Sequence, residues 1–235
     1  MLYVKILHMS NTVGSLEIPN VLYARKRMFL AISDRQREIL IGCILGDAYV
    51  TPKGKIVIEQ SEKQKEYVKW KHRELSSLCY PKGPRVLVHK LKTTNKEYRS
   101  IFFHLRQYFR PWREIFYNGK QKIFPKEIIL TPLTLAVWYM DDDCWTGKKC
   151  VISIESFKGE SCKNIQESLF KQFGIYTTIG KNGKLTIRKR SQVIFYALIT
   201  PYILSSMKYK IPNPVTTGSR FVKINLVKIE DAVVH

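Results

Sequence analysis

The stretch ILIGCILGDAYV, residues 39–50, decides the fold. Its first eight residues are apolar or small, and Asp47 is its only charged residue. Ser33 stands three residues before Gln36, the spacing of a capping box, so we expect a helix from about residue 34 to 46. A helix C-terminus carries partial negative charge, which disfavours a carboxylate there. The stretch therefore predicts a buried helix whose C-terminal end requires a compensating cation.

A second segment of the chain has the same design. Thr131 and Pro132 are an N-cap and a first helical residue, and they open the apolar run LTLAVWYMDDDCW at 133–145. Asp142 follows Asp47 by 95 positions (142 minus 47). In the first helix, Gly42 and Gly46 are four residues apart, so they share one face and permit another backbone to approach closely.

Two further matches indicate an internal duplication. VIEQSEK (57–63) and ISIESFK (152–158) keep the offset of 95, which aligns Gln60 with Glu155. QKIFP (121–125) and YKIP (209–212) each place a lysine, Lys122 or Lys210, before a hydrophobic residue and a proline. Three matches in the same order favour two copies of one unit.

Each copy is predicted to be αββαββα, so the fold class is α+β with two pseudo-symmetric halves. After the first helix of the first half we expect two short strands within 48–60, a helix at 63–78, strands at 85–92 and 97–104, and a closing helix at 105–117. In the second half we expect two short strands within 145–155, a helix at 160–173, strands at 175–181 and 184–190, and a closing helix at 191–206. Asn182-Gly183 is a type I′ turn signal between the last two strands. Lys184, Thr186, Arg188 and Arg190 alternate with Leu185 and Ile187, which predicts one cationic and one apolar sheet face, although Lys189 breaks the alternation.

The charge balance points to a polyanionic partner. The 235 residues carry 40 Lys and Arg against 19 Asp and Glu, a net charge of +21, distributed along the whole chain. No apolar run approaches the about 20 residues of a membrane span, and no clear secretory segment precedes residue 30. Five cysteines without a CxxC pair argue against a zinc site and against a disulfide framework, and fit a reducing compartment inside a cell.

The two apolar helices resemble the signature helices of LAGLIDADG homing endonucleases. LIGCILGDA (40–48) and LAVWYMDDD (135–143) both have aspartate at the eighth position, and GDAY, LTP, MDD and YKIPN follow in the order seen in monomeric members. The likeness covers roughly residues 31–215. It implies two signature helices packed on a pseudo-twofold axis and two saddle-shaped antiparallel sheets that lie in the DNA major groove.

The resemblance also implies a divalent metal, normally Mg²⁺, and cleavage of both strands of a long duplex site. On this mapping Asp47 and Asp142 are metal ligands, assisted by the backbone carbonyls of Gly46 and Asp141. Lys122 and Lys210 match the basic active-site lysines, and Gln60 and Glu155 fall where a polar side chain orients the attacking water.

Physical chemistry supports this set of residues. Two carboxylates at adjacent helix ends repel each other, and hard divalent cations relieve that repulsion. Lysines nearby offset charge in the transition state. The triplet Asp141, Asp142 and Asp143 leaves the second ligand open; we favour Asp142 because it alone keeps the offset of 95. Gln60 shares the strand parity of Ile56 and Ile58, whereas Glu155 has the opposite parity to Ile152 and Ile154.

The strands supply candidate DNA contacts, since a two-stranded ribbon fits the major groove. In the first half the candidates are Lys53, Lys55, Arg85, Lys90, Lys92, Tyr98 and Arg99. In the second half they are Lys184, Thr186, Arg188 and Arg190.

Two other functions remain open. A basic saddle also binds structured RNA, so the chain could be a maturase that assists splicing of its host intron. A non-cleaving DNA-binding regulator of the same fold is the other alternative. We expect a monomer of one N-terminal extension (1–30), two halves (31–130 and 131–218) and a C-terminal tail (219–235). The resemblance implies an organellar location, in a mitochondrion or chloroplast.

Overall fold

The computed structural model describes residues 18–25, 28–90, 96–142, 144–145 and 149–212, with the backbone alone at 142, 144 and 145. Lys92, Asp143 and the tail from 219 onward therefore lie outside the described residues, as does the side chain of Asp142. None of the described helices is long and apolar enough to cross a membrane.

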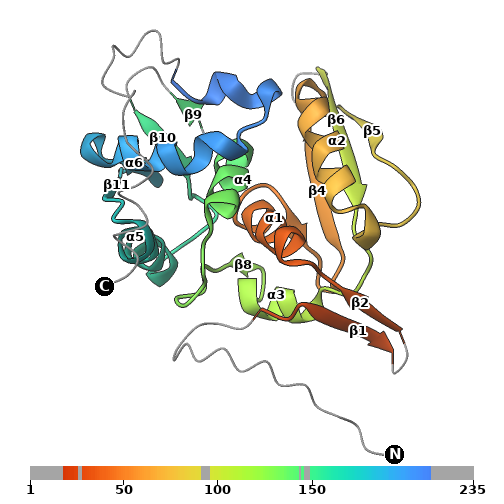
Figure 1. The fold of residues 1–235 in the computed structure, drawn as a ribbon. Helices are drawn as coiled ribbons and strands as arrows, with labels where there is room; N and C mark the ends of the chain where they lie inside the picture. The colour runs from red at the N-terminus through yellow and green to blue at the C-terminus, as the bar shows by residue number, and fades with distance from the viewer. Residues whose placement is uncertain (1–17, 26–27, 91–95, 143, 146–148, 213–235) are drawn as a thin grey trace, which may run out of the picture.

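The structure contains two halves of similar element order (Figure 1). The first half consists of α1 (Asp34–Leu45), β3 (Tyr49–Val50), β4 (Ile56–Ser61), α2 (Lys65–Glu74), β5 (Arg85–Lys90), β6 (Glu97–His104) and α3 (Arg110–Phe116). The second half consists of α4 (Pro132–Asp142), β9 (Cys144–Trp145), β10 (Cys150–Ser153), α5 (Glu160–Phe173), β11 (Thr177–Ile179), β12 (Lys184–Ile187) and α6 (Lys189–Ile199). The predicted αββαββα order is therefore present twice.

The two four-stranded sheets have equivalent strand orders, and every pairing in them is antiparallel. The first is ordered β3-β4-β6-β5 and the second β9-β10-β12-β11. In β4, Ile56, Ile58 and Gln60 are buried while the intervening residues are half-buried. One face of the sheet thus packs on the helices and the other is left for a partner.

The helices α1 and α4 pack side by side between the sheets (Figure 1). A Cβ built on Gly42 would lie 2.7 Å from the carbonyl oxygen of Thr134 and 2.7 Å from Cβ of Val137. A Cβ on Gly46 would lie 2.6 Å from Cβ of Asp141. The close approach predicted for the two glycines is confirmed, and Gly42 makes the room that Val137 occupies.

The capping residues act as their sequence predicts. Ser33 accepts from the amide of Gln36, and the Gln36 side chain accepts from the amide of Ser33, both at 3.2 Å. The Thr131 hydroxyl accepts from the amide of Thr134 at 3.1 Å at the start of α4. Both signature helices are therefore started by local hydrogen bonds and then buried by the seam between them.

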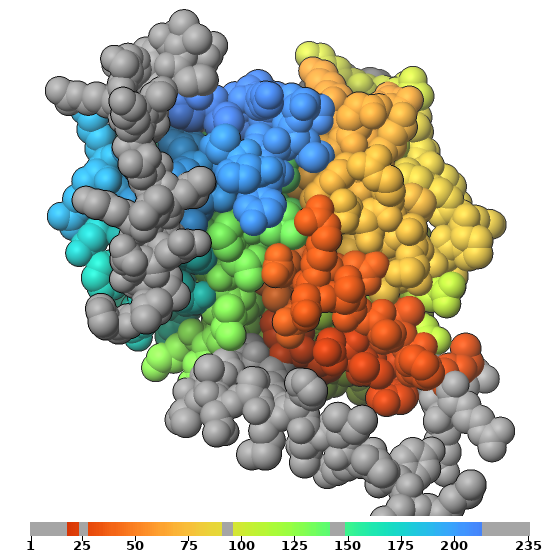
Figure 2. Space-filling model, viewed as in Figure 1, coloured from red at the N-terminus to blue at the C-terminus, as the bar shows by residue number. Residues whose placement is uncertain are grey.

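The two halves also contact each other away from the seam between α1 and α4. Short 3₁₀ segments η3 (Thr200–Tyr202) and η4 (Ser205–Lys210) follow α6. In Figure 2 this blue end of the second half lies against the orange α2 of the first, and Gln64 donates to the Tyr209 hydroxyl at 3.3 Å. Lys210 is carried back in this way toward the helix seam.

Part of the predicted N-terminal extension is a β-hairpin, β1 (Val21–Arg25) with β2 (Met28–Ala31). Leu22 and Leu30 are buried on one face, and Trp112 of α3 donates to the carbonyl of Pro19 at 3.0 Å. The hairpin therefore packs on the first half (Figures 1 and 2).

The hairpin of β11 and β12 in the second half differs from the predicted form in its connecting loop and at the end of its return strand. The Gly183 amide donates to the carbonyl of Gly180 at 3.0 Å, and Gly183 has φ +73°, so the loop is longer than a two-residue type I′ turn. The return strand β12 ends at Ile187 instead of residue 190, because Arg188 is the N-cap of α6. The helix that starts at Lys189 explains why this residue breaks the strand alternation.

Candidate active site and nucleic-acid interface

Asp47 is exposed just beyond the C-terminal end of α1, at the seam with α4. Its backbone amide lies 3.4 Å from Oδ2 of Asp141, the buried penultimate residue of α4. The ends of the two signature helices are thus in direct contact, and the carboxylate of Asp47 is open to a ligand from solvent.

A lysine donates to the backbone at each helix end. Nζ of Lys122, in the short strand β8 (Gln121–Lys122), is 2.7 Å from the carbonyl oxygen of Gly46. Nζ of Lys210 is 2.5 Å from the carbonyl oxygen of Met140 and 3.2 Å from that of Asp141. The repeated lysine-hydrophobic-proline motifs therefore bring one ammonium group to each signature helix, where it offsets the negative helix end.

Gln60 lies between the carboxylates of both helices. Its Nε2 is 3.0 Å from Oδ2 of Asp47 and 3.2 Å from Oδ1 of Asp141. Gln60 is 5% exposed, and its Oε1 is buried without a hydrogen-bond partner. The strand parity that favoured Gln60 is confirmed by this placement.

The Asp141 side chain forms a buried ion pair with Lys71 of α2, a residue that sequence reasoning missed. Nζ of Lys71 is 2.5 Å from Oδ1 of Asp141, and both side chains are fully buried. Burial lowers the pKa of Lys71, but the Asp141 carboxylate outweighs it and the pKa is raised above its ordinary value. The ammonium therefore remains charged, and Asp141 faces a lysine inside the seam.

Two predicted site residues are placed less directly. Asp142 is the last residue of α4, next to the seam, and its side chain lies outside the described part of the chain. Glu155 is exposed in the turn after β10, with its Oε1 3.6 Å from Nζ of Lys184. No hydrogen bond or ion pair of the described residues joins Glu155 to Asp47 or to Gln60.

The donors at the helix ends suit a hard divalent cation. Asp47 offers carboxylate oxygens, and the carbonyl oxygens of Gly46 and Asp141 each keep a second lone pair beside the one that accepts from a lysine. Among the described residues no three His, Cys, Asp or Glu side chains form a metal-binding cluster, at the seam or away from it.

The open face of the first sheet carries polar and aromatic side chains. Cross-strand register puts Arg85, His89, Tyr98 and Glu59 on this face. His89 stacks on Tyr98 with ring centroids 4.5 Å apart, and its Nε2 lies 2.6 Å from Oε1 of Glu59. His89, another residue missed from sequence, thus fixes the orientation of Tyr98.

Four predicted DNA contacts are not on the open faces of the strands. Arg99 and Lys90 have the parity of buried Ile101, the helix-covered side, and Arg99 pairs with Glu62 at 3.1 Å. Arg188 and Arg190 belong to the cap and first turn of α6, and the Arg190 guanidinium lies 3.7 Å from the Tyr176 ring centroid. The structure therefore does not place these four side chains on the open sheet faces, and their contacts with DNA stay predictions. The expected strand alternation ends at Ile187 because Arg188 already caps the helix α6.

The remaining candidates keep an accessible position. Lys53 is exposed in the β3–β4 turn, and Lys55 is half-buried immediately before β4. In β12, Lys184 and Thr186 are half-buried and alternate with buried Leu185 and Ile187, as predicted.

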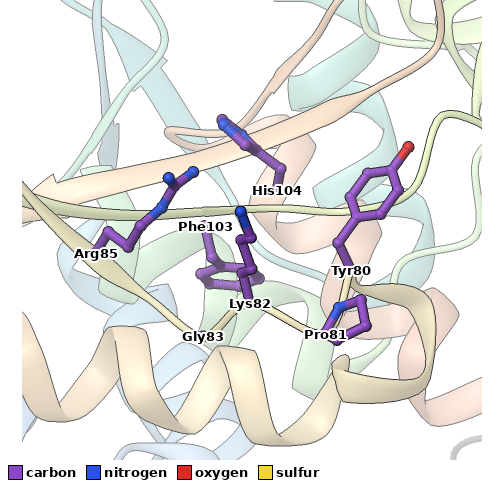
Figure 3. A pocket seen from close by; sticks show the side chains of 7 residues that line it. All are labelled: Tyr80, Pro81, Lys82, Gly83, Arg85, Phe103 and His104. Carbon is purple, nitrogen blue, oxygen red and sulfur yellow. The ribbon is translucent and has the colours of Figure 1, made fainter.

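A pocket of about 380 Å³ opens at the edge of the first sheet (Figure 3). Between the Cys79–Leu105 bridge and Arg85, where β5 begins, residues 80–84 do not pair with β6, and the pocket lies at this place against Phe103 and His104. Lys82, Arg85 and His104 line it, and Nδ1 of His104 is buried without a partner. Burial, Lys55 and Arg85 lower the pKa of His104, which favours its neutral imidazole beside Lys82 and Arg85.

Comparison with known proteins identifies the fold and the family. The model of the LAGLIDADG DNA endonuclease family matches residues 37–195, which include both signature helices and both sheets. The chain belongs to this family. The resemblance seen in the two aspartate-ended helices is thereby confirmed.

A solved homing endonuclease and a curated intron-encoded endonuclease are similar to most of the chain. The homing endonuclease I-WcaI, solved bound to its DNA recognition sequence, superposes with a TM-score of 0.68 at 24% identity, over 77% of this chain and 87% of that one. A probable intron-encoded endonuclease 1 of Wickerhamomyces canadensis is 28% identical over 79% of this chain and 87% of its own length.

A curated maturase is equally similar. The cytochrome b mRNA maturase bI2 of Saccharomyces cerevisiae is 29% identical over 75% of this chain and 47% of its own length. The chain thus spans about half the length of this relative.

Proposed function

We propose that the chain is a site-specific endonuclease that hydrolyses one phosphodiester in each strand of a long DNA duplex. The observation that carries the proposal is the pairing of the two signature helix ends, where Asp47 is exposed and one lysine reaches each end. Membership of a DNA endonuclease family supports the reaction class. The net charge of +21 fits a polyanionic substrate.

The residues at the seam are assigned complementary roles. Asp47 and Asp142 bind the divalent metal, for which we propose Mg²⁺, with help from the carbonyls of Gly46 and Asp141. A metal bound there supplies an activated water and stabilises the leaving oxygen. Gln60 holds Asp47 by its Nε2 and accepts from the attacking water at Oε1. Glu155 remains a prediction for the equivalent role in the second half.

Lys122 and Lys210 offset negative charge that develops on the phosphate during attack. Each is held by the backbone of a signature helix, so its position is set before substrate binds. Because the lysines are already in place, we expect them to stabilise the transition state of cleavage more than they strengthen DNA binding.

The open sheet faces bind the duplex. On the first sheet Arg85 and Tyr98 lie on this face, and Lys82 and His104 extend it into the edge pocket, where we place a backbone phosphate (Figure 3). Lys53 and Lys55 flank β4, and Lys184 and Thr186 serve the second sheet. Because one chain contains both halves, we propose that the protein is a monomer. We also propose that it acts within an organelle.

Cleavage is tested by incubating the protein and its Asp47→Asn variant with duplex DNA in Mg²⁺ and sequencing both strands at every new end. The similarity to an mRNA maturase favours a second candidate, assistance to the splicing of a host intron RNA. Splicing of the host transcript by Asp47→Asn protein would support that activity independently of cutting.

A further inference from the structure

A buried charge pair lies behind the proposed active site. Lys71 and Asp141 are 2.5 Å apart and fully buried, on α2 of the first half and α4 of the second. Apolar residues of similar volume often stabilise a protein as well as a buried ion pair does, because both charges lose their hydration. Stability alone therefore gives little reason for this pair.

The contacts of Asp141 lead to the proposed site. Its Oδ1 accepts from both Lys71 and Gln60, and its Oδ2 faces the amide of Asp47 at 3.4 Å. Gln60 in turn donates to the Asp47 carboxylate at 3.0 Å. A continuous chain of contacts thus runs from α2 through α4 and β4 to the metal ligand proposed on α1.

This chain of contacts fixes which way the Gln60 amide points. The two carboxylates beside it accept hydrogen bonds and donate none, so Nε2 must face them. Oε1 is then the atom on the other side, buried and without a partner. If Asp141 were absent, the amide would lose one of its two acceptors and rotation about its last torsion would cost less.

The two positions related to this pair by the internal duplication, Gly46 and Gln166, do not form an equivalent ion pair. At the offset of 95, Asp141 corresponds to Gly46 (141 minus 95) and Lys71 to Gln166 (71 plus 95). The Gln166 side chain is used elsewhere, donating to the carbonyl of Thr177 at 3.3 Å. The pair, which joins α2 of the first half to α4 of the second, therefore has no counterpart at the symmetry-related positions.

We propose that Lys71 and Asp141 are positioning residues that lock the Gln60 amide, so that its Oε1 is presented to the attacking water at the first-half end of the site. This inference rests on the proposed endonuclease function. It predicts a one-sided effect, with one DNA strand depending on the pair more than the other.

Two matched double variants separate positioning from folding. Lys71→Met/Asp141→Leu removes both charges and the acceptor for Gln60, while Lys71→Met/Asp141→Asn removes both charges and keeps an amide oxygen as acceptor. Thermal unfolding, duplex affinity in Ca²⁺ and the single-turnover cutting rate of each strand in Mg²⁺ are measured for both. We expect both variants to fold and to bind DNA.

The leucine variant should cut one strand about tenfold or more slowly, the size expected for one lost hydrogen bond to a charged group. The asparagine variant should recover most of that loss. Unchanged cutting by the leucine variant, equal losses in the two double variants, or equal slowing of both strands would each overturn the proposal.

A measurement on the unaltered protein covers the case in which a variant fails to fold. Both N–H hydrogens of the Gln60 side chain should exchange slowly with solvent in an NMR experiment, because each is donated to a carboxylate. Rapid exchange would overturn the inference even if the protein cuts DNA. Slow exchange in a protein that cuts no duplex would leave the lock intact and contradict the proposed function.

Discussion

Nζ of Lys122 lies 2.7 Å from the carbonyl oxygen of Gly46, the residue that ends the first signature helix. Lys210 has the equivalent relationship with Asp141 in the second half, at 3.2 Å, and it also donates to the carbonyl of Met140 at 2.5 Å. The two lysines are 88 positions apart (210 minus 122), whereas the signature helices keep an offset of 95. Chain segments of different length thus deliver the same cation to each helix end.

Replacement of either lysine by methionine should impair cutting much more than binding. Loss of one preorganised donor to a transition state costs about 10²–10³ in rate. The rate is measured in single turnover with Mg²⁺, and affinity separately in Ca²⁺. Lys126→Met, which removes an exposed lysine next to the same motif, is the control with the same change in charge. Equal effects of Lys122→Met and Lys126→Met would argue against an active-site role for Lys122.

Asp47→Asn should abolish cutting and leave the fold intact, because the side chain is exposed and the change preserves its size. Affinity for duplex DNA without metal should be equal or higher, since a negative charge that faces phosphates is removed. Asp142→Asn should behave in the same way. Asp141→Asn should impair cutting less, because an asparagine oxygen still accepts from Lys71 and Gln60, but it should lower stability because Lys71 loses its buried counter-charge. A dead Asp141→Asn with an active Asp142→Asn would reverse the assignment of the second ligand.

Two arginines on opposite faces of the first sheet test the binding surface. Arg85 is on the open face and lines the edge pocket, whereas Arg99 is on the helix-covered side beside Glu62. Arg85→Ala should weaken binding and lower the slope of log affinity against log salt by about 1. Arg99→Ala should leave that slope unchanged. A larger effect from Arg99 would place DNA on the other face.

The seam should be intolerant of a single methyl group. Gly42→Ala would bring Cβ to 2.7 Å from a backbone oxygen of α4, so the helices must separate. We expect a loss of about 1–3 kcal/mol in the free energy of unfolding. Gly83→Ala has no heavy atom within 4 Å of its new Cβ and serves as the control. Denaturant unfolding of the two variants decides this point.

Acid should weaken the contact between α1 and α2. A hydrogen bond from Arg35 lowers the pKa of Glu74, which is 2.8 Å away. A lowered carboxyl pKa contributes stability above the unfolded pKa of about 4.3, and this is lost as pH falls through the folded value. Glu74→Gln should therefore flatten the loss of stability below about pH 5. The change should stay under about 1 kcal/mol, since Arg35 is half exposed.

The sequence predicted most of the fold because its strongest signals are local. Capping at Ser33 and Thr131, the apolar runs behind them and the 95-residue offset each depend on short stretches, and the structure has helices at both places. The closing helix of each half was placed less well, since α3 begins at Arg110 and α6 ends at Ile199. Residues 105–109 before α3 form a bridge and a turn, and residues 200–202 after α6 form a 3₁₀ segment, and neither has a distinct sequence pattern.

The contacts that cross between the halves could not be predicted. From the sequence alone, Lys71 cannot be distinguished from an ordinary lysine on a helix surface, because its contact with α4 depends on the tertiary packing. Its partner Asp141 is followed by two further aspartates, so the sequence does not show which of the three is paired. Strand parity correctly placed Gln60 on the buried face of its strand, because β4 alternates regularly. The same reasoning could not show that Arg99 is on the covered face, since that depends on which strand is its neighbour.

The most direct test of the central claim is cleavage of a randomised duplex library in Mg²⁺, with the ends of both strands sequenced. We predict paired breaks at one long related sequence, absent from a parallel reaction with Asp47→Asn protein. Ends no more frequent with the unaltered protein than with Asp47→Asn would contradict the account.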